Sequence, residues 1–256
     1  MELRERMETI EDTVEWVLTG WLIDGTGGPI RHNALIQVLN GKIALIRRVR
    51  REEVVSFGQP VLDLSACTVL PGLVDSHVHL TMSGTNDEAV RERQLSFTFD
   101  EAKGVIRQHL SEQLAHGVVM VRDGGDAAAH ALRFKDEGLA PLELPISFKA
   151  SGKAWRAKGR YGRLIGRPPA EGKTLAQALT EKGRAADHVK IVNAGLNSLK
   201  EFGKETAPQF SEEELGAALQ AARRLGLKTM VHANGRIPVR DRSEERRVGK
   251  ECRSRW

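Results

Sequence analysis

The pattern of apolar and polar positions changes once along the chain, close to residue 70. Before that point, five short apolar or alternating runs are separated by turn residues, which is typical of β-strands. These runs lie at residues 17–24, 34–39, 42–46, 61–64 and 68–70. The dipeptide Asn40-Gly41 between two of them is the strongest short signal for a β-hairpin. Residues 1–70 are therefore predicted to form a small all-β segment.

From Leu73 onward, apolar runs alternate with amphipathic helical patterns, which indicates parallel βα units. Strands are predicted at residues 73–80, 118–123, 145–150, 189–192 and 229–233. Helices are predicted at residues 100–115, 127–136, 174–186 and 211–225, the first capped by Asp100 and the last by a Ser211–Glu214 capping box. Residues 152–169 are rich in Gly, Arg and Lys and are predicted to form a long loop.

Five strands of this kind do not close a barrel, because the commonest closed parallel form has eight. The expected fold class is α/β, with residues 71–241 forming a partial (β/α)8 TIM-type barrel, its first five βα units. The all-β segment of residues 1–70 precedes it.

The basic charge of the chain is concentrated at its end. The formal net charge is +5, and the last fifteen residues carry six Lys or Arg against three Glu, so the rest of the chain is nearly neutral. Residues 242–256 resemble the conceptual translation of a sequencing-library adapter, and they show neither a helical nor a strand period. We therefore expect this tail to be non-native and the natural protein to be longer. A nearly neutral body argues against a nucleic-acid partner.

Other features of the sequence indicate the cellular compartment of the protein. No run approaches eighteen apolar residues, and the charged N-terminus lacks the apolar core of a secretory signal. Cys67 and Cys252 are too few for a disulfide framework. A cytoplasmic protein without a membrane partner is the expectation.

Two histidines stand at the end of the first predicted barrel strand. His77 and His79 are two residues apart, so both side chains leave the same face of a strand, and neutral imidazoles so placed can bind one divalent metal. A bare His-x-His more often marks two unrelated polar residues. Here the pair follows Pro71-Gly72 and an apolar run, at the carboxyl end of a barrel strand, where barrel enzymes build their sites. This context favours a metal site.

The segment from Pro71 to His79, Pro-Gly-Leu-Val-Asp-Ser-His-Val-His, resembles the signature of the amidohydrolase superfamily, in the branch of imidazolonepropionase-like enzymes and metal-dependent prolidases. The resemblance covers residues 17–235 and implies a β-sandwich beside a (β/α)8 barrel. It implies that His77 and His79 bind the more buried metal and that His232 is a further ligand. Lys190 corresponds to a lysine that is carbamylated in many members and bridges two divalent ions, of which zinc is the first expectation.

Two functional positions that the resemblance implies are not found in this sequence. The family uses a histidine on the sixth strand and an aspartate after the eighth, and neither position falls within the chain. No catalytic residue is therefore assigned, and the chain by itself is expected to be inactive. The remaining histidines are expected in turns or on helix surfaces, without a catalytic role; they are His32, His109, His116, His130 and His188.

The implied reaction is metal-dependent hydrolysis of an amide or cyclic C–N bond in a small-molecule amide, dipeptide or cyclic amide. In the predicted loop, Tyr161 and Arg163, with Arg156 and Arg160 beside them, could meet a substrate carboxylate. An exposed basic loop without a ligand explains the same residues equally well. A non-catalytic, amidohydrolase-like assembly protein is the alternative function, and a homo-oligomeric full-length form stays open.

Overall fold

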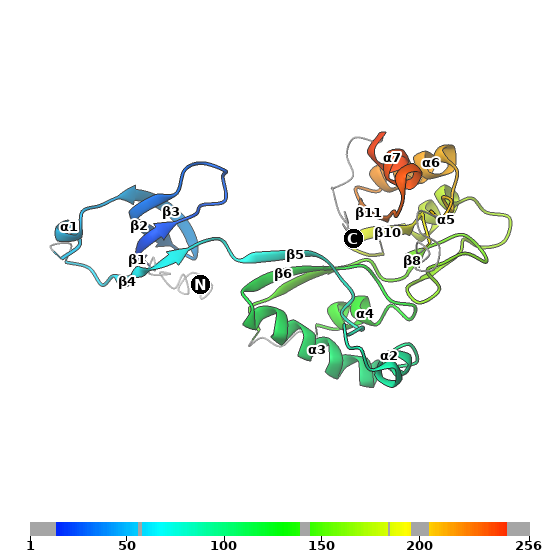
Figure 1. Ribbon diagram of the computed structural model, residues 1–256, viewed down its shortest axis with the longest axis horizontal. Coiled ribbons are helices and arrows are strands. Elements are labelled where there is room, and N and C mark those ends of the chain that lie inside the picture. The colour runs from blue at the N-terminus through cyan, green and yellow to red at the C-terminus, as the bar shows by residue number, and fades with distance from the viewer. Residues whose placement is uncertain (1–13, 56–57, 139–143, 184, 196–204, 245–256) are drawn as a thin grey trace, which may run out of the picture. The chain divides into compact units, whose positions relative to one another are not determined.

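The computed structural model describes residues 14–55, 58–138, 144–183, 185–195 and 205–244 (Figure 1). The chain divides into two compact units, residues 1–72 and 73–256. Most of the adapter-like tail lies outside the described residues, and helix α7 (Arg236–Glu244) includes its first three positions. Within the described ranges, no helix has the length and apolar character needed to cross a membrane.

The first unit contains one mixed sheet in the order β3-β2-β1-β4. Its elements are β1 (Val14–Leu22), β2 (Arg31–Leu39), β3 (Lys42–Arg48), the short helix α1 (Arg51–Val55) and β4 (Leu62–Val69). The predicted hairpin is confirmed: β2 and β3 are antiparallel, and Asn40 and Gly41 both have positive φ, as a type I′ turn requires. The runs at residues 61–64 and 68–70 belong to one strand, β4, which pairs in parallel with β1.

Both faces of this sheet carry buried apolar side chains. Leu18, Leu35 and Val49 form one cluster, and Leu22, Ala34 and Ile36 form a second. Two clusters follow from the alternation of side chains along a strand. The structure describes a single sheet here, and a β-sandwich stays a prediction.

The second unit is built on parallel strands, as the alternating pattern predicts. One sheet has the order β5-β6-β7 and the other the order β11-β10-β8-β9, and every pair is parallel. Their bounds are β5 (Leu73–Val78), β6 (Val118–Asp123), β7 (Ser147–Ala150), β8 (Ala154–Trp155), β9 (Gly166–Arg167), β10 (His188–Val192) and β11 (Lys228–His232). The predicted loop at residues 152–169 thus contains two short strands that its composition did not reveal.

The third βα strand is divided between the two sheets. β7 pairs with β6, and only three residues later β8 pairs with β10. At the break, Gly152 has a φ of 67°, and Asp187 N donates to Ala150 O at 3.0 Å, so the end of β7 also contacts the start of β10. The strands thus follow the order β5-β6-β7 in one sheet and β8-β10-β11 in the other, with β9 at the outer edge beside β8.

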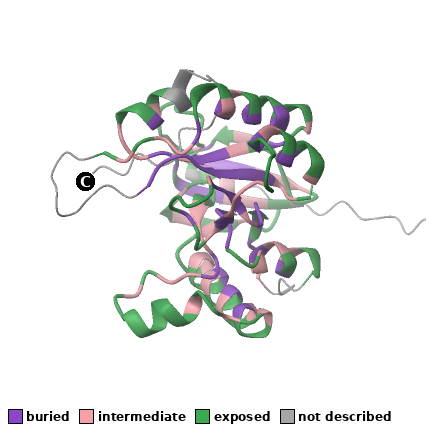
Figure 2. Cartoon of the chain, turned by 90° about the vertical axis from the view of Figure 1, so that its right-hand side faces the viewer, coloured by how far each residue is buried: buried purple, intermediate pink, exposed green. Residues whose placement is uncertain are grey.

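Helices connect these strands, and those that pack on the sheets present exposed outer faces (Figure 2). They are α2 (Glu88–Gln94), α3 (Phe99–Ala115), α4 (His130–Asp136), α5 (Leu175–Lys182), α6 (Glu212–Arg224) and α7. One core packs α3 and α4 on β6 and β7 around Ile106, Val121 and Phe134. Another packs α5 and α6 on β10 and β11 around Leu179, Ile191 and Leu219.

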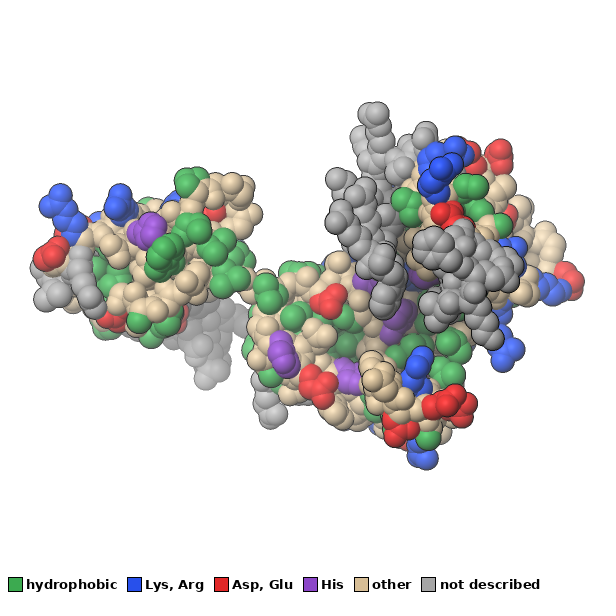
Figure 3. Space-filling view, viewed as in Figure 1, with side chains coloured by type: hydrophobic (Ala, Val, Ile, Leu, Met, Phe, Trp, Pro, Cys, Tyr) green, Lys and Arg blue, Asp and Glu red, His purple; other side chains and the backbone are tan. Residues whose placement is uncertain are grey.

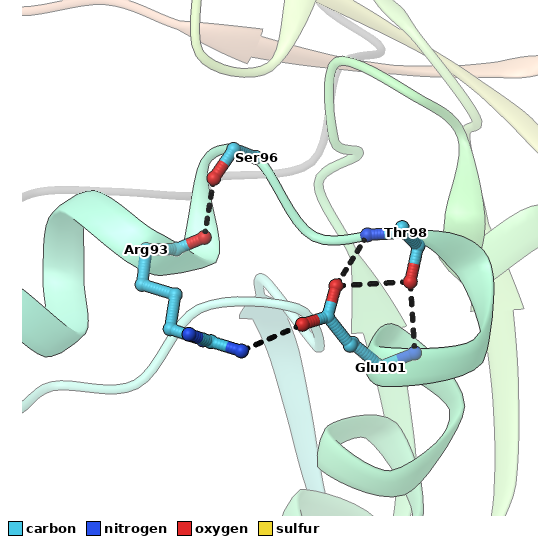
Figure 4. Close-up of polar contacts among 4 residues, drawn as sticks. All are labelled: Arg93, Ser96, Thr98 and Glu101. Atoms are coloured by element: carbon cyan, nitrogen blue, oxygen red, sulfur yellow. Dashed lines mark hydrogen bonds and ion pairs between the residues drawn. The ribbon is translucent and has the colours of Figure 1, made fainter.

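The start of α3 differs from the prediction. Thr98, not Asp100, is the N-cap, and it forms a capping box with Glu101 (Figure 4). Glu101 Oε2 accepts from Thr98 N at 2.9 Å, and Thr98 Oγ1 accepts from Glu101 N at 3.4 Å. Thr98 and Glu101 have the spacing of a capping box in the sequence itself, so the prediction overlooked a local signal and placed the cap two residues too late.

Helix α6 begins at the predicted place. Ser211 Oγ accepts from Glu214 N at 3.2 Å, which is half of the predicted capping box. The carboxylate of Glu214 accepts from Leu175 N at 3.4 Å, at the start of α5. This residue therefore joins the first turns of two neighbouring helices.

Candidate metal centre

His77 and His79 lie at the carboxyl end of β5, and their rings stand edge to face with centroids 5.3 Å apart. His79 Nδ1 is 2.8 Å from Gly125 O. A carbonyl oxygen can only accept, so Nδ1 carries the proton and Nε2 keeps its lone pair for a metal. Residues far apart in sequence thus fix the tautomer that a ligand needs.

Gly124 gives the two rings their space. Its backbone N donates to Val78 O at 2.7 Å, which brings the end of β6 directly against the histidines. A Cβ at position 124 would lie 2.8 Å from His79 Cε1 and 3.1 Å from His77 Nε2. Any larger residue would displace both imidazoles, so the close approach requires glycine.

Lys190, in the middle of β10, points at His77. Its Nζ lies 3.0 Å from His77 Nε2 and 3.1 Å from Met230 Sδ, and the residue is only 1% exposed. Met230 is its register partner on β11. These contacts place the lysine nitrogen between β5 and β11, away from solvent.

His232, the remaining predicted ligand, ends β11, the strand next to β10. Its Nε2 is 3.3 Å from Asn234 Nδ2, and its ring centroid lies 5.8 Å from that of Tyr161. It is close enough to Lys190, His77 and His79 for their charges to interact. Figure 3 shows several histidine side chains, in separate places, on the viewed face of the second unit.

The histidines are neutral in this setting. Burial and then the charge of Lys190 lower the pKa of His77 to about 3, and the same two causes lower the pKa of His232 to about 4. Burial also lowers the pKa of His79. Neutral imidazole is the form that binds metal, so these side chains need lose no proton at pH 7.

Asp123, which the sequence did not mark as a site residue, holds together the segment that follows β5 and the segment that follows β6. Its Oδ2 accepts from Leu80 N at 2.8 Å and its Oδ1 from Gly125 N at 2.7 Å. Burial raises the pKa of Asp123 to about 7. The signal was present in the sequence, as an acidic residue at the end of an apolar strand, but its partners follow only from the fold.

The described residues include no group of three or more His, Cys, Asp or Glu side chains close enough to hold a metal ion. The cluster that forms consists instead of two histidines and a lysine.

The family model for the amidohydrolase family matches residues 68–252. The chain belongs to this family. An imidazolonepropionase from Thermoplasma volcanium is 38% identical over 222 residues, covering 79% of this chain and 51% of the relative. One from Paraburkholderia phymatum is 28% identical over 219 residues, covering 78% and 53%. The chain thus spans about half the length of these curated relatives.

Solved structures agree on the fold of this amidohydrolase family member. A Xaa-Pro dipeptidase with bound methionine in its active site has a TM-score of 0.66 at 24% identity, covering 90% of this chain and 59% of its own. An ochratoxinase from A. niger has a TM-score of 0.64 at 17% identity, covering 90% and 58%. At these identities the likeness concerns the fold alone.

The basic loop of this amidohydrolase divides into two kinds of residue. Arg156 is 9% exposed and donates to the carbonyls of Ala157, Arg160 and Gly166. Arg160 donates to Ala207 O and Pro208 O. These two guanidinium groups hold the loop in shape. Tyr161 is 39% exposed beside His232, and Arg163 is exposed, so a ligand can reach both.

The expectation for the remaining histidines is wrong in two cases. His32 lies on β2, and His188 is a buried residue at the start of β10. The predicted strand began one residue too late for His188. The others are on helices or at their ends, where His109 contacts Leu80 O, His116 contacts Glu112 O and His130 contacts Phe97 O.

Proposed function

We propose that this chain belongs to a metal-dependent hydrolase of amide or cyclic C–N bonds, and that His77, His79, Lys190 and His232 bind its divalent ions. The observation that carries the proposal is the buried contact of Lys190 Nζ with His77 Nε2 at 3.0 Å. Membership of the amidohydrolase family supports it. So do the names of two relatives, imidazolonepropionase and Xaa-Pro dipeptidase.

The donors suit zinc once Lys190 is a carbamate. The neutral amine attacks CO2, a new N–C bond forms, and one proton leaves the nitrogen. The product offers two anionic oxygens, which divalent ions accept beside imidazole nitrogens. The nitrogens of Lys190 and His77 lie 3.0 Å apart, so a carbamate on Lys190 and the imidazole of His77 would both be able to hold metal at this place.

When bound, the metal supplies Lewis-acid chemistry, lowering the pKa of water and polarising the carbonyl that is attacked. The chain's own residues prepare this centre. Gly125 O fixes the tautomer of His79, and Asp123 holds the segments that carry His79 and Gly125. Tyr161 and Arg163 would contact the small-molecule amide, dipeptide or cyclic amide, the arginine by pairing with its carboxylate.

The proposal extends to the whole protein. We expect the full-length form to be cytoplasmic, without nucleic-acid or membrane partners, and a homo-oligomer remains open. Residues 1–70 as a sandwich segment, residues 71–241 as part of a (β/α)8 barrel and residues 242–256 as a non-native tail also remain predictions.

Zinc analysis of the full-length protein tests the metal set. We expect bound zinc in the presence of bicarbonate, and affinity reduced about 10- to 100-fold or more in His77→Ala and Lys190→Met. His116→Ala is the matched control, because this exposed histidine contacts only its own helix in Glu112 O. Less than one equivalent of metal, with no loss in His77→Ala, would contradict the proposal and favour the non-catalytic assembly protein.

Bicarbonate labelling tests the bridge separately. With 13C-bicarbonate, the wild-type protein should show a carbamate carbon resonance that Lys190→Met lacks. A protein that binds zinc without this resonance has an unmodified Lys190.

A further inference from the structure

The short segment before α6, residues 205–210, holds together three loops at the carboxyl ends of the strands. Arg160, in the loop after β8, donates to Ala207 O and Pro208 O. After β10, Asn193 O accepts from Gln209 N at 2.8 Å, and Asn193 Oδ1 accepts from Phe210 N at 3.1 Å. After β11, Arg236 N donates to Glu205 Oε2 at 2.7 Å.

The side chain of Gln209, within this segment, makes three hydrogen bonds. Its Oε1 accepts from Ala157 N at 2.9 Å, while its Nε2 donates to Tyr161 O at 2.9 Å and to Ala194 O at 3.1 Å. Both amide protons and the oxygen are thus used on backbone groups. A side chain committed in this way is suited to fix a loop rather than to bind a ligand.

The loop that Gln209 fixes carries Tyr161. Its ring lies 5.8 Å from the ring of His232, centroid to centroid. The next residue, Gly162, has a φ of 103°, and a Cβ there would lie 3.0 Å from a methyl group of Val192. The loop therefore lies directly on the end of β10, and Asn193 N in turn donates to His232 O at 2.9 Å. One hydrogen-bonded path joins Tyr161, Gln209, Asn193 and His232.

We propose that Gln209 is a positioning residue that holds the phenol of Tyr161 beside His232, and thereby sets the space a substrate meets at that side of the metal centre. That a substrate binds in this space rests on the proposed function. The positioning itself depends only on the contacts between Gln209, the loop and β10.

The chain offers a clean spectroscopic test, because Tyr161 is its single tyrosine. Incorporation of 3-fluorotyrosine into the 256-residue chain gives one 19F resonance, measured without metal. We expect the folded wild-type resonance to differ from that of the urea-unfolded chain. Gln209→Glu keeps the acceptor for Ala157 N but sets a carboxylate against two carbonyls, and should move the resonance at least halfway to the unfolded position. Gln220→Glu, an exposed change of the same charge on α6, should leave it in place.

Two outcomes would overturn the inference. One is a wild-type resonance at the unfolded position. The other is a Gln209→Glu variant with lower thermal stability but an unmoved folded resonance, which would make Gln209 merely structural. Should Gln209→Glu not fold, Gln209→Met decides, because it keeps the length of the side chain and removes the amide that donates to Tyr161 O and Ala194 O. It must move the same resonance for the inference to hold.

Kinetics of the full-length enzyme give a second readout. We expect Gln209→Glu to raise KM by about tenfold or more with a smaller change in kcat, because ground-state positioning is lost and the metal ligands are untouched. Failure of wild-type zinc binding would contradict the proposed function alone. The 19F result, obtained without metal, would still decide the role of Gln209.

Discussion

At the scale of single residues, glycine decides whether the histidines can lie where they do. We expect Gly124→Ala to reduce zinc affinity by about 10- to 100-fold, because its Cβ would lie 2.8 Å from His79 Cε1. Isothermal titration measures this. Gly104→Ala is the control: its Cβ meets nothing within 4 Å on α3, so zinc affinity should hold while stability rises by about 0.5–1 kcal/mol. Equal zinc affinities in Gly124→Ala and wild type would refute the requirement.

Buried titratable residues predict how stability depends on pH in the metal-free protein. Burial holds the pKa of His77 near 3 and that of His232 near 4, below the ordinary 6.5. Between its folded pKa and pH 6.5, each of these histidines therefore binds more protons in the unfolded chain than in the folded one. Their contribution to the free energy of unfolding is complete above pH 6.5. It is lost as the pH falls to about 4 for His232 and about 3 for His77, by at most about 1.4 kcal/mol per pH unit for each histidine.

Asp123 acts in the opposite direction, since its folded pKa of about 7 lies above the ordinary 3.8 and its proton uptake stabilises the fold as the pH falls. Urea unfolding at pH 7.5, 6 and 5 with a chelator measures the net effect of the histidines and Asp123 on the free energy of unfolding. His77→Gln should make the loss of stability toward acid shallower, and Asp123→Asn should make it steeper. Identical slopes in the two variants would show that neither group titrates as the structure implies.

At the scale of elements, the reciprocal cap of α3 should contribute measurably. Thr98→Ala removes the side chain that accepts from Glu101 N, and we expect a loss of about 1 kcal/mol in the free energy of unfolding. Thr180→Ala is the matched control, because Thr180 Oγ1 donates to Ala176 O inside α5, where alanine suits the helix better. Thermal or urea unfolding should show a loss for the first variant and none for the second.

At the scale of the whole molecule, metal binding and folding should be coupled. In the proposed centre, zinc would bind the folded arrangement of β5, β10 and β11, since in the unfolded chain residues 77 and 190 are far apart. With bicarbonate and zinc at 100 times the dissociation constant, we expect the second unit to gain about 2.7 kcal/mol. Calorimetry with and without a chelator measures the gain, and Lys190→Met should reduce it sharply. An unchanged melting temperature on zinc addition would count against the metal centre.

The sequence by itself determined what local chemistry controls. Asn40-Gly41 selects its turn, apolar runs select parallel strands, Ser211 begins α6, and His77 and His79 share a face because a strand alternates. These features depend on neighbours a few positions apart. The short strands β8 and β9 were missed because two residues carry no periodicity, and α2 and α7 because their patterns are weak.

Only the tertiary structure decided which distant groups meet. Sequence could name Lys190, but its contact with His77 joins strands 113 positions apart. It gave no sign that Asp123 would bind Leu80 N, that Gly124 would make room for two rings, or that Gln209 would reach Tyr161. Hydrogen bonds and close packing of this kind are set by the crossing of strands and loops in space, which no local pattern encodes.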